Sequence, residues 1–190
     1  MSTIPAKPTK RIHPKMFLLW IAIGSIIMMF AGLTSAYIVR RMQGNWEAYQ
    51  LPTIFWISSG VLILSSICLF VASANYKRNN YSTYRNFLGI TLLLGIVFCV
   101  LQYKGWQALM NVGILLSDQT PSGAFLYVIS GLHATHVLGG IVFLLIFWIK
   151  SFKLPYPQEY PNLGIDILST YWHFIGILWL YLFGFFMYYQ

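Results

Sequence analysis

The chain has 190 residues, of which 58% are hydrophobic, 18% aromatic and only 8% charged. This composition excludes a soluble globular domain and is typical of a polytopic membrane protein. The formal net charge is +8, but the basic residues fall in separate loops rather than in one patch, which favours lipid head groups over nucleic acid as their partners.

The N-terminal segment differs in composition from the rest of the chain. Residues 1–15 are polar and basic and contain Pro5, Pro8 and Pro14. We interpret them as a basic cytoplasmic tail that cannot form a core, followed by one transmembrane domain over residues 16–190. The apolar run after the tail exceeds the roughly 7–15 residues of a secretory signal, so we expect it to stay in the mature protein.

Five apolar segments are long enough to cross a hydrocarbon core, which takes about 20 residues of helix. Strands of a membrane barrel alternate in polarity and are about half as long, so the pattern favours helices. The third segment is the shortest if Lys104 ends it, but its apolar character resumes through Trp106 to Leu116. The predicted spans are about 17–39, 53–76, 86–103, 123–149 and 164–189. The fold class is therefore all-α, with five transmembrane helices.

Basic residues are distributed unequally between the two ends of these predicted helices. One side carries Lys7, Lys10, Arg11, Lys15, Lys77, Arg78, Arg85, Lys150 and Lys153. The other side carries Arg40, Arg41 and Lys104. The positive-inside rule therefore predicts a cytoplasmic N-terminus and, after five crossings, a periplasmic C-terminus.

Acidic residues are too few to build a path across the membrane. Only Glu47, Asp118, Glu159 and Asp166 occur, and none lies deep in a predicted span. Asp166 comes closest, at the start of the fifth span, where a negative charge suits a helix N-terminus. No internal repeat or pair of broken helices is present, which disfavours a secondary transporter.

Histidines in the fourth and fifth spans are the main candidates for a site. His133 and His136 lie one helical turn apart, and His173 lies in the next span. Imidazoles rarely face lipid, so these side chains must face protein, water or a cofactor. Their depths differ by about 10 Å between the two spans, too far for one shared metal ion. We therefore predict no catalytic, cofactor or metal site, and imidazoles that hydrogen-bond across helix interfaces.

Small residues recur at helical spacing and predict close contacts between helices. The predicted stripes are Gly24, Gly32 and Ala36 in the first span and Gly131, Thr135 and Gly139 in the fourth. In the fifth span, Asp166, Ser169, His173 and Gly176 share one face. Composition and spacing thus favour a non-catalytic subunit of a larger membrane complex, with an autonomous channel or transporter as the alternative.

Two motif blocks resemble a known family. The run Ser122-Gly123-Ala124-Phe125 followed by Gly131-Leu132-His133-x-x-His136-Val137-x-x-Gly140 resembles the sixth helix of subunit III of haem-copper oxidases. The run Asp166-x6-His173, with Tyr171-Trp172-His173-Phe174, resembles its seventh helix. Gln102 with Gly105-Trp106, and Ala36-Tyr37, extend the match over most of the chain. The chain resembles the bacterial five-helix form of cytochrome c oxidase subunit III.

This resemblance implies a subunit that binds neither haem nor copper, because the redox centres of the family lie in subunits I and II. It implies that the chain packs on and stabilises subunit I of a proton-translocating oxidase of the aa3 or caa3 type, in aerobic respiration at the bacterial cytoplasmic membrane. Bound phospholipid, a small subunit IV and a quinol-oxidising complex are further expected associates. A quinol oxidase subunit III or the related protein of nitric oxide reductase is the alternative within the family.

The resemblance also assigns roles to particular residues. Packing or subunit contact falls to Gly131, His133, His136, Gly140, Asp166, Trp172 and His173. Lys150 matches the cationic residue that ends the sixth helix of the family, and we expect it to contact a lipid phosphate. The chain departs from the family where Ile26 replaces a buried glutamate, Gly176 replaces an aspartate, and Asp166 stands where a glutamate is usual.

Overall fold

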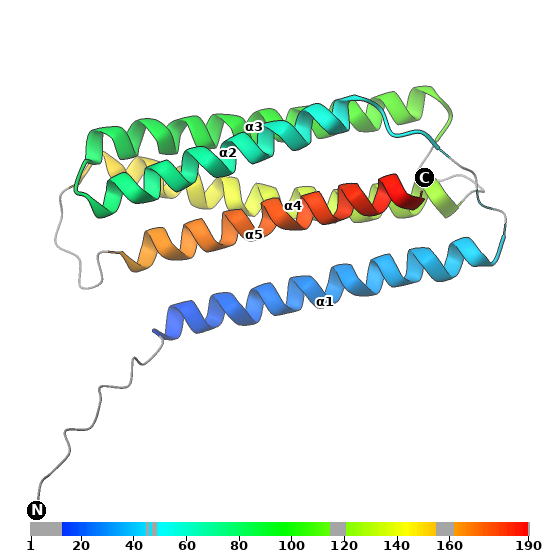
Figure 1. Ribbon diagram of the computed structural model, residues 1–190, viewed down its shortest axis with the longest axis horizontal. Coiled ribbons are helices and arrows are strands. Elements are labelled where there is room, and N and C mark those ends of the chain that lie inside the picture. Colours follow the sequence, from blue (N-terminus) through cyan, green and yellow to red (C-terminus); the bar gives the residue numbers. More distant parts are fainter. Residues whose placement is uncertain (1–12, 45, 47–48, 115–120, 155–161, 190) are drawn as a thin grey trace, which may run out of the picture.

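The computed structural model of the chain describes residues 13–44, 46, 49–114, 121–154 and 162–189, and all regular secondary structure in these ranges is helical (Figure 1). The helices are α1 (Pro14–Met42), α2 (Ile54–Lys77), α3 (Tyr81–Asn111), α4 (Pro121–Ser151) and α5 (Leu163–Tyr189). All five are long and apolar enough to cross a membrane. The predicted all-α fold with five transmembrane helices is therefore confirmed.

Local signals explain where two of the helices begin. Pro14 opens α1, and the ring nitrogen Nδ1 of His13 accepts a hydrogen bond from the Lys15 backbone N–H at 3.3 Å. The Asn80 side chain caps α3 by accepting from the Thr83 N–H at 3.4 Å. Asn79 adopts a φ of 59° in the preceding turn, a left-handed conformation that asparagine tolerates better than most residues.

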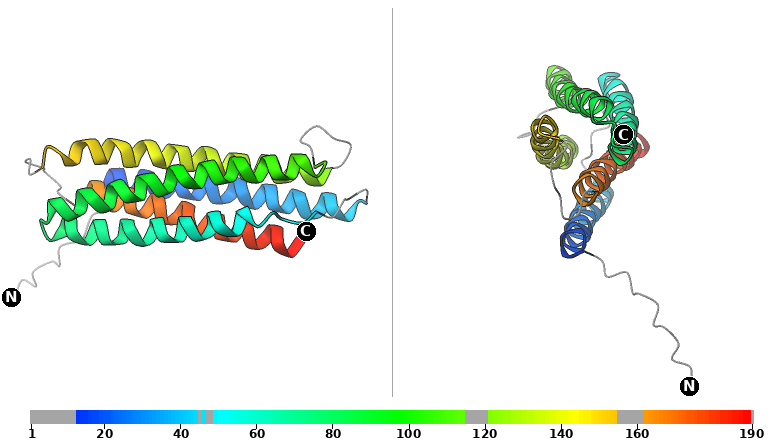
Figure 2. Two further views of the ribbon diagram at one scale, coloured as in Figure 1. Left: turned by 90° about the horizontal axis from the view of Figure 1, so that it is seen from above. Right: turned by 90° about the vertical axis from the view of Figure 1, so that its left-hand side faces the viewer.

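Successive helices run antiparallel along one common direction (Figures 1 and 2). The helices α2 and α3 form the most closely packed pair, α4 packs on α3, and α5 packs on both α2 and α4. In the described residues α1 contacts only α4 and α5. It therefore lies at one edge of the bundle, apart from the α2–α3 pair (Figure 2).

The two ends of the bundle differ in charge. One end, which we call the basic end, holds the start of α1, the α2–α3 turn and the end of α4 (Figure 1). The described basic residues there are Lys15, Lys77, Arg78, Arg85, Lys150 and Lys153, against Arg40, Arg41 and Lys104 at the opposite end. Residues 1–12 of the predicted tail, with Lys7, Lys10 and Arg11, lie outside the described ranges, as do Glu47, Asp118 and Glu159.

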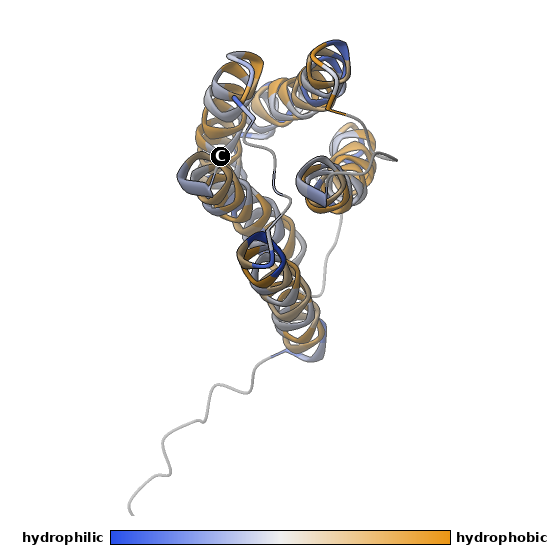
Figure 3. Cartoon of the chain, turned by 90° about the vertical axis from the view of Figure 1, so that its right-hand side faces the viewer, coloured by the Kyte–Doolittle hydropathy of each residue, from blue (hydrophilic) through white to orange (hydrophobic). Residues whose placement is uncertain are grey.

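Hydrophobic residues extend over the outward as well as the inward faces of the helices (Figure 3). Helices of this kind are typical of membrane spans, because lipid is as apolar as the interior of the bundle. Helix α3 continues past Lys104 to Asn111, as the apolar character beyond Lys104 indicated. Its added turns carry Gly105 and Leu109, which are buried against neighbouring helices.

Most residues of the predicted small-residue stripes do not mark the helix contacts in the described part of the chain. A Cβ atom added at Gly24, Gly32 or Gly131 would meet nothing within 4 Å, and Thr135 is exposed. Helix α1 instead packs through bulkier residues: Ile23, Ile26, Phe30, Thr34 and Tyr37. Gly24, Gly32 and Gly131 therefore face open space. Gly139 does approach α5, since a Cβ atom there would lie 3.6 Å from the Tyr171 hydroxyl oxygen.

Candidate functional site

The seven residues predicted for packing or subunit contact fall into two groups. His133, Gly140 and Trp172 are buried inside the bundle. The partly exposed members are Gly131, His136, Asp166 and His173. Residues of the first group hold the five helices together and cannot themselves contact another subunit, whereas the second group can.

His133 occupies an aromatic enclosure at the centre of the bundle. Its side chain is 0% exposed, and its ring centroid lies 5.0 Å from that of Trp179, 6.0 Å from Phe98 and 6.4 Å from Phe30. These rings come from α5, α3 and α1, so the imidazole on α4 contacts three other helices. Neither ring nitrogen has a hydrogen-bond partner within the described ranges. The predicted hydrogen bond across a helix interface is therefore wrong for His133, because aromatic rings surround it.

His136 also differs from the prediction. Its Nδ1 lies 2.7 Å from the Leu132 carbonyl oxygen, a hydrogen bond within α4 rather than between helices. The contact with α5 is made by the backbone, since the Tyr171 hydroxyl donates to the His136 carbonyl oxygen at 3.2 Å. The imidazole itself packs edge-on against Phe30 of α1, with ring centroids 5.9 Å apart.

Trp172 joins α5 to three helices through two glycines and a serine. A Cβ atom at Gly140 of α4 would lie 2.9 Å from the indole ring, and one at Gly95 of α3 would lie 2.8 Å from it. The Trp172 Nε1 donates to the Ser65 hydroxyl of α2 at 3.2 Å. Gly140 and Trp172 were predicted, but Gly95 and Ser65 were not, because a single glycine or serine in an apolar run carries no signal of its own.

Serine hydroxyls, rather than imidazoles, make the buried hydrogen bonds between helices. The Trp179 Nε1 donates to the Ser59 hydroxyl at 2.9 Å, which joins α5 to α2. The Gln102 amide donates to the Ser58 hydroxyl at 3.0 Å, which joins α3 to α2. Polar contacts between helices are thus present as expected, but they are made to Ser58 and Ser59, which the sequence did not single out.

Asp166 forms an ion pair at the basic end. Its Oδ1 lies 2.8 Å from the Lys77 Nζ, which joins the start of α5 to the end of α2. Asp166 also lies in the first turn of α5, so the expected helix N-terminal position is observed. Both side chains are about half exposed, so the pair holds two helix ends together without a buried charge.

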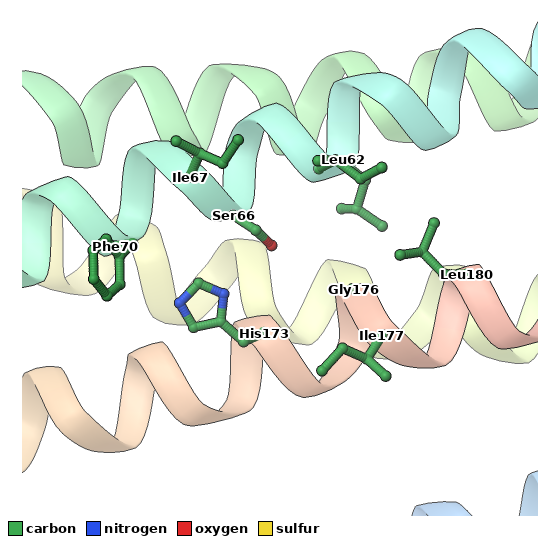
Figure 4. A pocket seen from close by; sticks show the side chains of 9 residues that line it. Leu62, Ser66, Ile67, Phe70, His173, Gly176, Ile177 and Leu180 are labelled. Atoms are coloured by element: carbon green, nitrogen blue, oxygen red, sulfur yellow. The ribbon is translucent and has the colours of Figure 1, made fainter.

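His173 lines an open groove between α2 and α5 (Figure 4). The groove has a volume of about 400 Å³, and we call it the His173 groove. It is lined by Leu62, Ile63, Ser66, Ile67 and Phe70 of α2 and by His173, Gly176, Ile177 and Leu180 of α5. A Cβ atom at Gly176 would lie 3.2 Å from the Ser66 Oγ, so the absence of a side chain there lets the two helices approach.

The described residues offer no metal site: within them, no group of three or more histidine, cysteine or acidic side chains lies close enough to hold a metal ion. His133 and His136 lie on one helix with their rings against Phe30, and His173 faces the groove between α2 and α5. The three imidazoles are therefore not brought together. Ile26, at which the resemblance led us to expect a glutamate, is buried on α1.

Comparison with known proteins places these residues in a family. The chain is 26% identical over 190 residues to cytochrome c oxidase subunit 3 of Bacillus sp. (strain PS3), covering 95% of this chain and 90% of the relative. It is 29% identical over 187 residues to a probable cytochrome c oxidase subunit 3 of Nocardia farcinica (strain IFM 10152), covering 93% and 91%. The family model described as cytochrome c oxidase subunit III matches residues 23–190, which contain both motif blocks. The chain therefore belongs to the cytochrome c oxidase subunit III family.

Proposed function

We propose that this chain is the non-redox subunit III of a proton-translocating cytochrome c oxidase of the aa3 or caa3 type. In this role it packs on the haem-bearing subunit I and stabilises it in the bacterial cytoplasmic membrane, with subunits I and II, and a small subunit IV, as partners. The observation that carries the proposal is the match to the subunit III family over residues 23–190. Haem and copper belong to the partner subunits, and electron transfer takes place there.

The geometry of the motif blocks supports a structural role. His133, Gly140 and Trp172 are all buried and are used in contacts between helices. A bundle fixed in this way presents a rigid apolar surface to its neighbours. Such a surface is suited to holding a larger membrane subunit in one arrangement.

The charge distribution supports a cytoplasmic N-terminus. Basic residues accumulate at the end of the bundle where α1 begins, and short cytoplasmic loops carry an excess of lysine and arginine. The same end suits anionic lipid, and we propose that Lys150 contacts a lipid phosphate there. Lys150 is exposed at the end of α4. A separate groove of about 890 Å³, which Lys150 does not line, lies at the same end against Arg85, Trp148 and Phe152.

Arg85 is held in a position from which it can support such a phosphate contact. Its guanidinium donates to the Ser151 carbonyl oxygen at 3.0 Å and lies 4.4 Å from the centroid of the Phe152 ring. One hydrogen bond uses one of the five N–H donors of a guanidinium. The guanidinium keeps its full positive charge near the interface, where lipid head groups lie, although its Nε is buried.

Recovery of the native complex tests the proposed function. The tagged chain is purified from its native membranes in a mild detergent, with an untagged strain as the control. We expect it to bring down a haem-bearing and a copper-bearing subunit that together oxidise cytochrome c. Recovery with a complex that oxidises quinol instead would assign it to the quinol oxidases, and a complex that reduces nitric oxide would assign it to that relative. Recovery of the chain alone, with solute flux into liposomes, would favour a channel or transporter.

A further inference from the structure

His173 lies near the middle of the membrane, and this depth limits which molecules can hydrogen-bond to it. Helix α5 runs from Leu163 to Tyr189, so its midpoint is Gly176, and at a rise of 1.5 Å per residue His173 lies within about 5 Å of that midpoint. That is about the middle of a hydrocarbon core roughly 30 Å thick. Water and lipid head groups do not reach this depth, so a polar side chain there needs a partner from protein.

The groove has no internal partner for the imidazole. No hydrogen bond joins His173 to any other described residue, although a neutral imidazole has one donor and one acceptor. Figure 4 shows the imidazole and the Ser66 hydroxyl both pointing into the space between α2 and α5. Every other side chain that lines the groove is apolar. An acyl chain could cover the apolar walls but would leave both polar groups without hydrogen bonds, at a cost that a protein partner avoids.

We infer that the His173 groove is the docking face for a transmembrane helix of a neighbouring oxidase subunit, one that places a hydrogen-bonding side chain opposite His173. This inference rests on the proposed function, which supplies the neighbour. The shape of the groove fits a helix, since Gly176 contributes no side chain to its floor and Ile177 and Ile67 form exposed walls on either side. Small residues at such contacts let helices approach closely, and a polar group fixes their register.

Two other outward-facing surfaces do not hold a polar side chain that needs a protein partner. The stripe of Gly24 and Gly32 on α1 has open space around it and no polar group that needs a partner. The groove beside Arg85 lies at the basic end, where head groups and water can satisfy a guanidinium. Of these surfaces, only the His173 groove combines an apolar wall with an unpaired polar group at the middle of the membrane.

Site-specific photo-crosslinking in the native complex tests the docking face. A photoreactive amino acid replaces Ile177 or Ile67, which are 67% and 55% exposed. Control positions at a similar depth on other faces are Val97 of α3 and Met28 of α1, which are 44% and 77% exposed. We expect the two groove positions to form adducts with the haem-bearing or copper-bearing subunit. Adducts with lipid alone at both groove positions, in a complex whose subunits co-purify, would overturn the inference and leave the proposed function intact.

Substitution of His173 provides the second measurement. We expect His173→Leu to lower retention of this chain in the purified complex about threefold to tenfold under stringent detergent washing, since a hydrogen bond between membrane helices is lost. His173→Gln keeps a donor and an acceptor and is expected to restore most of the retention. Equal retention of His173→Leu and the unsubstituted chain would count against the inference. Absence of any haem-bearing partner from the unsubstituted preparation would overturn both the inference and the proposed function.

Discussion

Trp172 of α5 occupies the space that Gly140 leaves on α4, because a Cβ atom at Gly140 would lie 2.9 Å from the indole ring. This contact joins the two motif blocks by which the family is recognised. It also explains why a residue with no side chain stands at Gly140 in the middle of a helix, where glycine is otherwise unfavourable by about 1 kcal/mol.

Enlarging this glycine should destabilise the bundle. We expect Gly140→Ala to lower the stability of the purified protein by about 1–3 kcal/mol, since the added methyl group overlaps the Trp172 ring. The matched control is Gly131→Ala in the same helix, where a Cβ atom meets nothing within 4 Å. Thermal unfolding in detergent would measure both variants. Similar melting temperatures for the two would contradict the close contact at Gly140.

Truncating the buried imidazole should loosen the core without removing a cofactor. His133 is fully buried, so His133→Ala leaves a cavity and is expected to cost about 2–5 kcal/mol. His133→Leu fills much of that volume and lacks unpaired polar atoms, so we expect it to cost less than about 1.5 kcal/mol. Melting temperature and recovery of subunit I would be measured together. A fall in haem per subunit I, at normal recovery of this chain, would instead indicate a ligand role.

Breaking a serine contact between helices should cost more than breaking one within a helix. Ser59→Ala leaves the buried Trp179 N–H without its partner, and we expect a loss of about 1 kcal/mol. The control is Ser25→Ala on α1, whose hydroxyl donates to the Ile21 carbonyl of its own helix at an exposed position. The added effect of Trp179→Phe in the Ser59→Ala background isolates the pair. Full additivity of the two substitutions would show that the hydrogen bond contributes no stability.

The raised pKa of Tyr49 should make the protein less stable at alkaline pH, because the phenol ionises more readily in the unfolded state. Burial, together with the nearby Tyr37 hydroxyl at 3.0 Å, raises the pKa of Tyr49 above its ordinary value of about 10. The folded state therefore keeps the phenol neutral while the unfolded state ionises above about pH 10, so stability is full below that pH and falls as pH rises through it. We expect Tyr49→Phe to flatten the decline in melting temperature between pH 9 and 11, a range chosen to bracket the ordinary tyrosine pKa of about 10.

The control for this pH profile is Tyr188→Phe, because Tyr188 is a highly exposed tyrosine near the same end of the bundle. Its substitution should leave the profile unchanged. A Tyr49→Phe profile that follows the unsubstituted protein above pH 10 would show that another group controls the alkaline loss.

Removing the cation at the end of α4 should reduce the amount of bound lipid. We expect Lys150→Ala to lower the phospholipid phosphorus retained per purified complex, because an exposed charge that attracts phosphate at the basic end is lost. Lys104→Ala removes one exposed charge at the opposite end and serves as the control. Equal phosphorus in the two variants and the unsubstituted complex would exclude Lys150 as a lipid contact.

The sequence alone was sufficient for the features that depend on local composition. Five long apolar runs determine five membrane helices, since a span is defined by length and hydropathy over neighbouring residues. The motif blocks around His133 and His173 were sufficient to identify the family. Asp166 could also be placed at a helix N-terminus, because it directly precedes an apolar run.

Only the tertiary structure decided which face of each helix meets which neighbour. In lipid the outside of a bundle is as apolar as its inside, so a hydrophobic pattern does not reveal the rotation of a helix about its axis. The stripe of Gly24 and Gly32 therefore faces outward although its spacing indicates contact, while the solitary Gly95 receives Trp172. For the same reason His133 lies among aromatic rings without a hydrogen bond, and His173 faces an open groove, although both lie within long apolar segments of the sequence.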